Sequence, residues 1–221
     1  MFYFRINKIK IKDNREAPKF LLFGPDLAEV KLFSFVTTGN VSLPSLDELL
    51  STENEDRKRE IIKSAVQQVA SSRLFTEIKN IKDNSVMTFG DTGYVLYQSE
   101  TIPDDLNWSF IAIESDKNVR TLGARMDTVV SHKGFDNFAK NLLKVLAGAT
   151  IPSYTAAVEI GKFVVSVTAE TLKENDDDLI GILYMSLNRR EHYLRGERKK
   201  DDVWDLTNNM QVDYSIFAFE S

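Results

Sequence analysis

The chain of 221 residues is long enough to bury a hydrophobic core, and its 43% hydrophobic and 28% charged residues are typical of a globular domain. Its formal net charge of −5 argues against a dedicated nucleic-acid-binding protein, which normally carries a basic bias. The lack of cysteine excludes disulfides, thiolate metal sites and cysteine nucleophiles.

The N-terminal segment has the pattern of a strand rather than of a targeting signal. Apolar and polar residues alternate from Phe2 to Lys12, with a slip near Asn7 and Lys8 that indicates a β-bulge. The segment lacks the apolar stretch of a signal peptide, and no run in the chain approaches the ~18 apolar residues needed to cross a bilayer. We therefore expect a cytoplasmic protein without a transmembrane segment, with peripheral membrane association left open.

The next part of the chain changes from a strand pattern to a helical one. The run Ala28–Val36 predicts a second strand. Ser45 and Glu48 have the spacing of a capping box, and apolar residues then recur every three or four positions through Ile61–Val69. We expect an amphipathic helical stretch whose charged residues form a solvated face.

The second half of the chain is rich in β-sheet patterns with one further helix. The stretch 134–148 places its apolar residues on one helical face and is stopped by Gly148 and Pro152. The segment 85–99 predicts two strands joined by a turn at Gly90–Gly93. Single strands are predicted at 107–116, 119–131, 156–170, 180–187 and 210–219.

These elements predict an α+β, mainly β fold. Strands begin and end the chain, and the regular β-α-β alternation of a doubly wound parallel sheet is missing. We predict an antiparallel β-sandwich with helical insertions at about residues 45–72 and 133–148. The chain is expected to be a single domain over 1–221, with the sandwich formed by about 1–40 and 85–221 and a helical insertion at about 45–80.

The stretch Gly161–Leu187 resembles part of the C2 domain, a β-sandwich best known for calcium-dependent phospholipid binding. The valines of 164–167 match a late strand of that family, and the run Asp177–Gly181 matches the acidic exit of the loop that follows. The resemblance implies a C2-like sandwich in which Ile180 fills one end of the core. It also implies that Gly181 lets the backbone turn tightly into the next strand.

The same resemblance implies calcium as the candidate cofactor. Asp177 and Asp178 of the late loop, Glu170 upstream and Asp26 of an early loop are the candidate ligands. Calcium takes about six to eight oxygen ligands, and the upstream Asp-x-Asp pair of the family is replaced here by Thr168–Thr171. We therefore expect no complete calcium site.

The segment 189–200 is the one basic concentration in this acidic chain. Its cations would bind phosphate head groups or an acidic partner, because each cation near an anionic membrane contributes ~1 kcal/mol. A solvated connection between two strands is the alternative interpretation. The candidate residues are Arg189, Arg190, Arg195, Arg198, Lys199 and Lys200.

No catalytic motif is recognisable in the sequence. The nucleophile-elbow, P-loop and dinucleotide-binding glycine patterns are missing, and His132 and His192 are not spaced as metal ligands. Asp104 and Asp105 have the composition of a glycosidase acid pair, but a turn opened by Pro103 accounts for them more simply.

We therefore expect a non-enzymatic C2-like module that binds anionic lipid or a membrane surface. The alternative is a protein-interaction or assembly subunit that uses the β-sandwich as its scaffold. Neither expectation includes nucleic acid as a partner.

Overall fold

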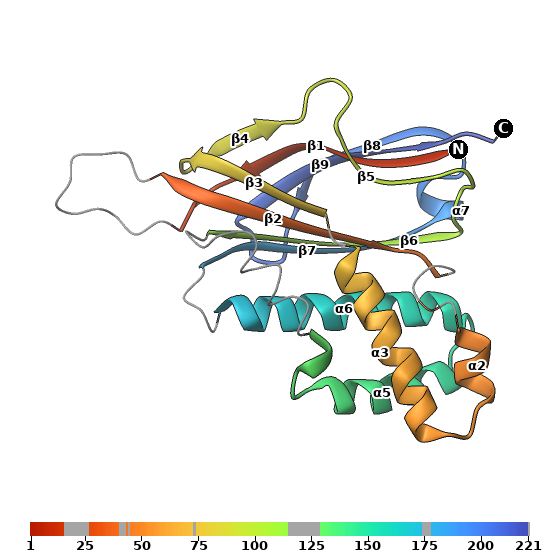
Figure 1. Ribbon diagram of the computed structural model, residues 1–221. Coiled ribbons are helices and arrows are strands. Elements are labelled where there is room, and N and C mark those ends of the chain that lie inside the picture. The colour runs from red at the N-terminus through yellow and green to blue at the C-terminus, as the bar shows by residue number, and fades with distance from the viewer. Residues whose placement is uncertain are drawn as a thin grey trace.

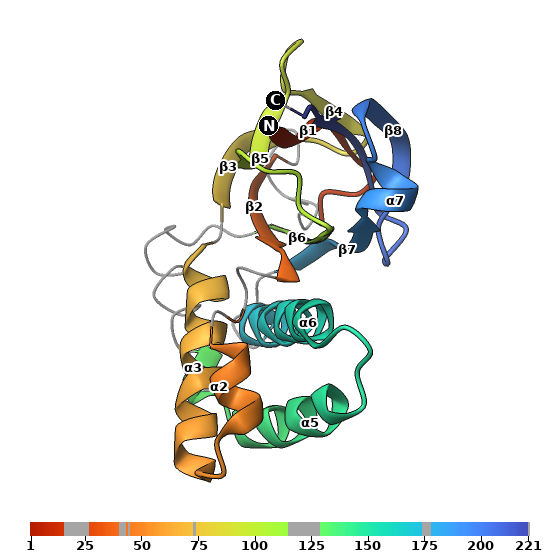
Figure 2. The ribbon, with the colours of Figure 1, turned by 90° about the vertical axis from the view of Figure 1, so that its right-hand side faces the viewer.

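The protein consists of two antiparallel sheets and a layer of helices. Within the described residues the two sheets lie face to face, and the helices cover the outer side of one sheet only (Figures 1 and 2). The mainly β architecture predicted from the sequence is therefore present. The computed structural model describes residues 1–15, 27–39, 43, 45–72, 74–114, 129–173 and 178–220.

Sheet A contains the first and last strands of the chain. Its order is β4-β1-β9-β8, and β5 pairs with the same edge of β1 as β4. The register of β1 against β9 shifts between Ile6 and Lys8, so the bulge predicted there is confirmed. The strands are β1 Phe2–Ile11, β4 Ser85–Thr88, β5 Tyr94–Ser99, β8 Gly196–Trp204 and β9 Met210–Ala218.

Sheet B has the order β3-β2-β6-β7. The central strands β2 and β6 are buried on both faces, because one face meets sheet A and the other meets the helices. The strand β3 lies within the stretch expected for a helical insertion and pairs with β2. The strands are β2 Ala28–Thr37, β3 Leu74–Ile81, β6 Asp105–Glu114 and β7 Asp178–Asn188.

The core between the sheets is built from the inward-facing residues of both. The ring of Phe4 in β1 lies 5.0 Å from that of Trp108 in β6 and 5.7 Å from that of Tyr214 in β9. The buried Trp108 donates from Nε1 to Ser34 Oγ at 2.8 Å, which satisfies its one polar group. Aromatic packing therefore joins sheet A to sheet B.

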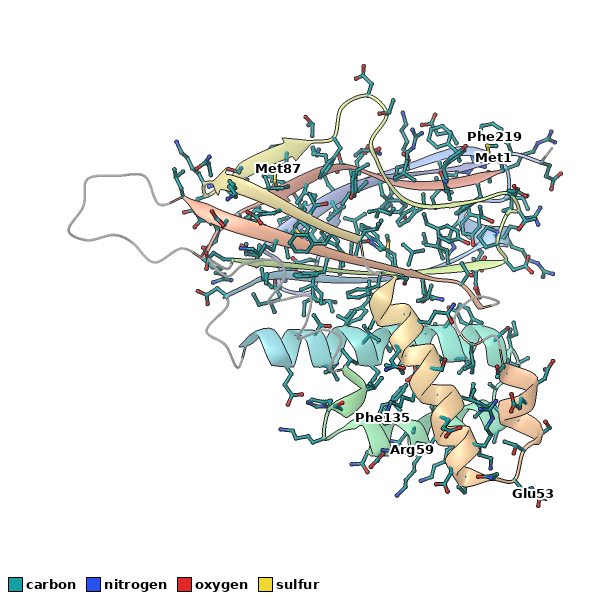
Figure 3. The ribbon with its side chains drawn as sticks, in the orientation of Figure 1. Met1, Glu53, Arg59, Met87, Phe135 and Phe219 are labelled. Carbon is teal, nitrogen blue, oxygen red and sulfur yellow. The ribbon has the colours of Figure 1, made fainter. Side chains whose placement is uncertain are left out.

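The helical layer forms a second core against sheet B. The helices expected at 45–72 and 133–148 are confirmed as α2, α3 and α5. Arg59 of α3 lies over the Phe135 ring at 5.6 Å, so α3 and α5 face each other through this pair (Figure 3). The helical elements are α2 Leu46–Ser51, α3 Glu55–Ser71, the 3₁₀ turn η1 Val129–Ser131, α5 Phe135–Ala147, α6 Pro152–Lys173 and α7 Arg189–His192.

The strand predicted at 156–170 is wrong, because this segment lies inside the helix α6. The abundance of valine and threonine favours a strand, but Ala157, Ile160 and Val164 recur at helical spacing and are fully buried. The helix contacts β6 on one side and α3 and α5 on the others. A helix enclosed in this way leaves only a narrow exposed stripe, which here includes Lys162 and Ser166, so its amphipathic period is weak.

This helix also contradicts the first half of the resemblance to the C2 domain, which required a strand at the valines. The valines of 164–167 lie in a helix that packs on the outside of sheet B, not in a strand leading into an acidic loop. In place of one strand–loop–strand unit, the chain has a helix followed by β7. No other finding identifies a C2 domain.

The helix starts also differ from the sequence prediction. Ser45 occupies the N-cap position of α2, but its side chain makes no capping hydrogen bond, so the predicted capping box is not formed. Instead α3 begins separately, and the side chain of its N-cap, Asn54, accepts from the backbone N–H of Arg57 at 3.1 Å. Most of the strand predicted at 119–131 lies outside the described residues. Among the helices of the described segments, none combines the length and hydrophobicity that crossing a membrane requires.

Candidate functional site

Of the four predicted calcium ligands, only Glu170 and Asp178 have described positions, in α6 and in β7, so the calcium site stays a prediction. Glu170 lies near the end of α6, where its carboxylate pairs with His132 and Lys133, each at 3.4 Å. Asp178 is exposed at the start of β7. Asp26 and Asp177 lie outside the described residues. Among the residues with described positions, no three His, Cys, Asp or Glu side chains are grouped so as to hold a metal ion.

Of the Ile-Gly pair after the acidic run, Ile180 lies in the core as the resemblance implied, whereas Gly181 lies inside β7 and not at a tight entry into the strand. Ile180 is fully buried in the core between the sheets. A Cβ on Gly181 would meet Asp205 Oδ2 and Met210 Cβ at 3.0 Å, so glycine permits this close approach. The buried Asp205 carboxylate accepts from the backbone N–H of Ile182 and Asn209, among others, and so holds the β8–β9 turn against β7.

The six cations predicted as a cluster are dispersed by the structure. Arg189 and Arg190 lie in α7, and the segment after Gly196 is the edge strand β8 rather than a loop. In β8, Lys199 lies opposite Ser215. Arg198 and Lys200 lie opposite Ile216 and Tyr214, on the other face of the strand, and Arg195 lies in the turn before it.

Lys199 instead joins cations that sequence reasoning missed, on the outer face of sheet A. Alternate residues of β1 point into the core, so those between them point outward. The register places Arg5 beside Ser215 and Lys199 across β9. No helix of the described segments covers this face (Figure 2). Its cations are Arg5, Lys8, Lys10, Lys12 and Lys199.

Several of these cations have partners on the same face. Lys8 Nζ lies 2.7 Å from Asp213, whose hydrogen bond is the main cause of the raised pKa of Lys8. The guanidinium of Arg5 lies 3.9 Å from the Phe217 ring centre, and Lys12 Nζ lies 4.7 Å from that of Trp204. The acids on this face are Asp202, Asp213 and Glu197.

The outer face of sheet A also exposes apolar side chains between its cations. Val86 of β4 lies opposite Lys10 and is 54% exposed, and Val95 of β5 lies opposite Arg5 and is 41% exposed. The side chain of Lys10 makes no ion pair or hydrogen bond with the described residues. The face thus combines basic, aromatic and exposed aliphatic groups.

A separate cleft lies at the end of sheet B, where β7 leads into α7. Its volume is about 790 Å³. The ends of β2, β6 and β7 and the first turn of α6 form its walls, so it brings together four distant segments (Figure 1). The lining residues are Thr38, Gly39, Pro103, Asp104, Asp105, Ile151, Ser153, Tyr154, Asn188, Arg189, Arg190, Glu191 and Leu194.

Asp105 is an acid of the cleft whose pKa is raised above its ordinary value. Partial burial raises the pKa of its carboxyl group, the hydrogen bond from the backbone N–H of Gly39 at 2.6 Å opposes that rise, and the neighbouring charge of Asp104 adds to it. Tyr193 lies nearby with a buried hydroxyl that has no hydrogen-bond partner in the described part of the protein. Burial and the two acids together raise the pKa of that hydroxyl.

The turn interpretation of Asp104 and Asp105 therefore accounts for only part of their environment. In the sequence, the cleft is marked by this acid pair and by Arg189 and Arg190, which lie 84 and 85 positions after Asp105. Backbone pairing between the N–H of Arg189 and the carbonyl of Asp104 at 2.9 Å joins the two signals. No protein-family model matches this sequence, and no curated protein matches it.

Proposed function

We propose that this protein is a non-enzymatic β-sandwich module that attaches to an anionic membrane surface through the outer face of sheet A. The observation that carries the proposal is the joint presence of five cations and exposed Val86, Val95 and Trp204 on the sheet face without helices. Cations near an anionic surface contribute ~1 kcal/mol each, and exposed apolar groups add hydrophobic burial at the interface.

The distribution of charge in the whole molecule favours this orientation. The chain carries a net charge of −5, so an anionic surface would repel most of it. On the outer face of sheet A the cations outnumber the acids, which makes this face the one that an anionic surface attracts. The proposed attachment rests on these cations and on the exposed apolar groups between them.

Vesicle co-sedimentation tests the proposal. We expect the native protein to bind vesicles containing phosphatidylserine equally with calcium or with a chelator, and less strongly as salt is raised. The double variant Lys10→Gln with Lys199→Gln should bind about thirtyfold more weakly, because two contributions of ~1 kcal/mol are removed. The matched control, Lys63→Gln with Lys144→Gln, changes two exposed lysines of α3 and α5 and should leave binding unchanged.

The outcome that contradicts the proposal is equally definite. Equal vesicle binding by both double variants would show that the outer face of sheet A is not the attachment surface. Absence of binding to anionic vesicles at low salt would reject membrane attachment as a whole.

The assembly alternative is favoured by a different observation, the free edge of β7. At the start of this edge, the backbone N–H of Ile182 donates to the Asp205 carboxylate, and its carbonyl accepts from the backbone N–H of Leu206. The stretch Leu183–Leu187 that follows carries no charge and pairs only with β6 in the described sheet. Neutral edge strands pair readily with another chain. Light scattering after gel filtration tests this alternative, and a monomer at all concentrations would count against self-assembly.

A further inference from the structure

The cleft at the end of sheet B offers side chains of both charge signs that are not engaged elsewhere. The Asp104 side chain is exposed and makes no hydrogen bond or ion pair with the described residues. Arg190 is likewise exposed and unpaired within the described segments, whereas its neighbour Arg189 is held by Glu220 at 2.7 Å. An anion and a cation are thus both open to a ligand in one cleft.

The second acid of the cleft is fixed in position. Gly39 donates its backbone N–H to Asp105 Oδ1 at 2.6 Å. A Cβ at Gly39 would also lie 2.9 Å from Asp105 Oδ2 and 3.2 Å from Ser153 Oγ, so β2, β6 and α6 are in close contact at this point. The carboxylate is therefore held beside Asp104 by the fold and keeps acceptor capacity for a donor in the cleft.

Apolar side chains flank these charges. Ile151 is 59% exposed at the start of α6, and Leu194 is 57% exposed after α7, and both line the cleft. Exposed aliphatic groups beside charged ones are typical of sites that bury an apolar part of a ligand and orient its polar part.

We propose that this cleft binds a short peptide with apolar side chains and free ends. The peptide's amino group pairs with Asp104 and Asp105, its carboxylate pairs with Arg190, and its side chains pack on Ile151 and Leu194. The volume of about 790 Å³ lies within the range of roughly 300–1,000 Å³ in which pockets hold ligands of drug size, and a single amino acid would fill only part of it. This binding is separate from membrane attachment, because the cleft shares no residue with the outer face of sheet A.

Isothermal titration calorimetry with the tripeptide Leu-Ala-Leu tests the proposal. We compare the free tripeptide with its N-acetylated form, which lacks the amino charge, and with its C-amidated form, which lacks the carboxylate. Each modification should weaken binding to the native protein about tenfold, because each removes one charged hydrogen-bonding group. The double variant Asp104→Asn with Asp105→Asn should lose the preference for a free amino end, and Arg190→Gln the preference for a free carboxyl end.

Matched variants separate recognition from folding. The controls are Glu53→Gln and Lys63→Gln. Glu53 lies at the tip of the α2–α3 turn and points away from the protein (Figure 3), and Lys63 lies on the exposed side of α3. Both should bind all three peptides as the native protein does. If the double aspartate variant unfolds, Asp104→Asn alone retains the test, because this side chain is exposed and makes no bond within the described structure.

Three results would contradict the inference. The first is no measurable binding of the free tripeptide at millimolar concentration. The second is binding that neither end modification weakens, which would show apolar adsorption without recognition of the ends. Loss of the amino preference in Arg190→Gln, with its retention in the aspartate variant, would also contradict the assigned orientation.

Discussion

Single residues determine how closely the elements around the cleft approach one another. Gly39 lies where the end of β2, the start of β6 and the first turn of α6 meet, and its neighbours leave no room for a side chain. Asp105 fills the same junction with a carboxylate that is only partly solvated. At this scale the packing depends on the absence of one methyl group, and partial burial raises the pKa of one acid.

Replacing Gly39 by alanine should destabilise the protein by about 1–3 kcal/mol, the usual effect of overpacking. The added Cβ would lie 2.9 Å from Asp105 Oδ2 and 3.3 Å from the backbone carbon of Ser153, so the start of α6 must move. Urea denaturation measures the change. Gly148→Ala is the control, because its Cβ would meet only Val145 O at 4.0 Å, and a change of similar size there would contradict the steric explanation.

The raised pKa of Asp105 predicts a specific dependence of stability on pH. Its folded-state pKa lies above the unfolded value of about 3.9, so the folded state binds this proton more readily. Stability therefore falls as pH rises from near that unfolded value through the folded-state pKa. Asp105→Asn removes this titration while keeping an acceptor for Gly39. The melting temperature of the variant relative to the native protein should be higher at pH 7 than at pH 3, and the opposite trend would contradict the direction of the shift.

At the scale of elements, the helix starts show which local signals the fold uses. The spacing of Ser45 and Glu48 fits a capping box, yet the Ser45 side chain makes no capping bond. Asn54, nine residues later, supplies a real cap to the longer helix α3. The cap that forms therefore belongs to α3, the longer helix, which contacts β2 and α6.

Two alanine substitutions distinguish these caps. Asn54→Ala should lower the free energy of unfolding by about 1 kcal/mol, because the N–H of Arg57 loses its acceptor. Ser45→Ala should change it by less than about 0.5 kcal/mol, as expected where no bond is lost. Chemical denaturation measures both. An equal loss at the two positions would show that Ser45 caps α2 in solution.

At the scale of the whole molecule, sheet B is the layer that both cores share. One face contributes Trp108 to the core between the sheets, and the other contributes Ile111 to the core under the helices. The helix α6 fills the centre of the second core and contacts β2, β6 and β7. Damage to the helical layer should therefore reach the core between the sheets.

The variant Ile160→Ala tests this coupling. Ile160 is fully buried in α6, so its truncation should destabilise the protein by about 2–5 kcal/mol. In a Trp204→Phe background, the fluorescence of Trp108 reports on the core between the sheets, and far-ultraviolet circular dichroism reports largely on the helices. The denaturation midpoints of both signals should fall together. An unchanged fluorescence midpoint would show that the two layers unfold independently.

Elements with one buried side, such as β1 and α5, were predicted correctly from their periodicity. In β1 the residues alternate between core and solvent, and in α5 the apolar residues Phe135, Leu142 and Leu146 share one face. These periods follow from backbone geometry alone, so a local pattern reports them. The same reasoning failed for α6, because its valine and threonine residues favour a strand and only a narrow stripe that includes Lys162, Ser166 and Glu170 is exposed.

The sequence by itself determined the antiparallel, mainly β character, the two outer helical stretches and the concentration of basic residues in 189–200. Only the tertiary structure decided which charges lie close together. Strand pairing places Lys199 and Arg5 on either side of Ser215 in sheet A. Arg190 instead lines one cleft with Asp104. The reason is that periodicity depends on neighbours a few residues apart, whereas a binding surface depends on the register between strands distant in the chain.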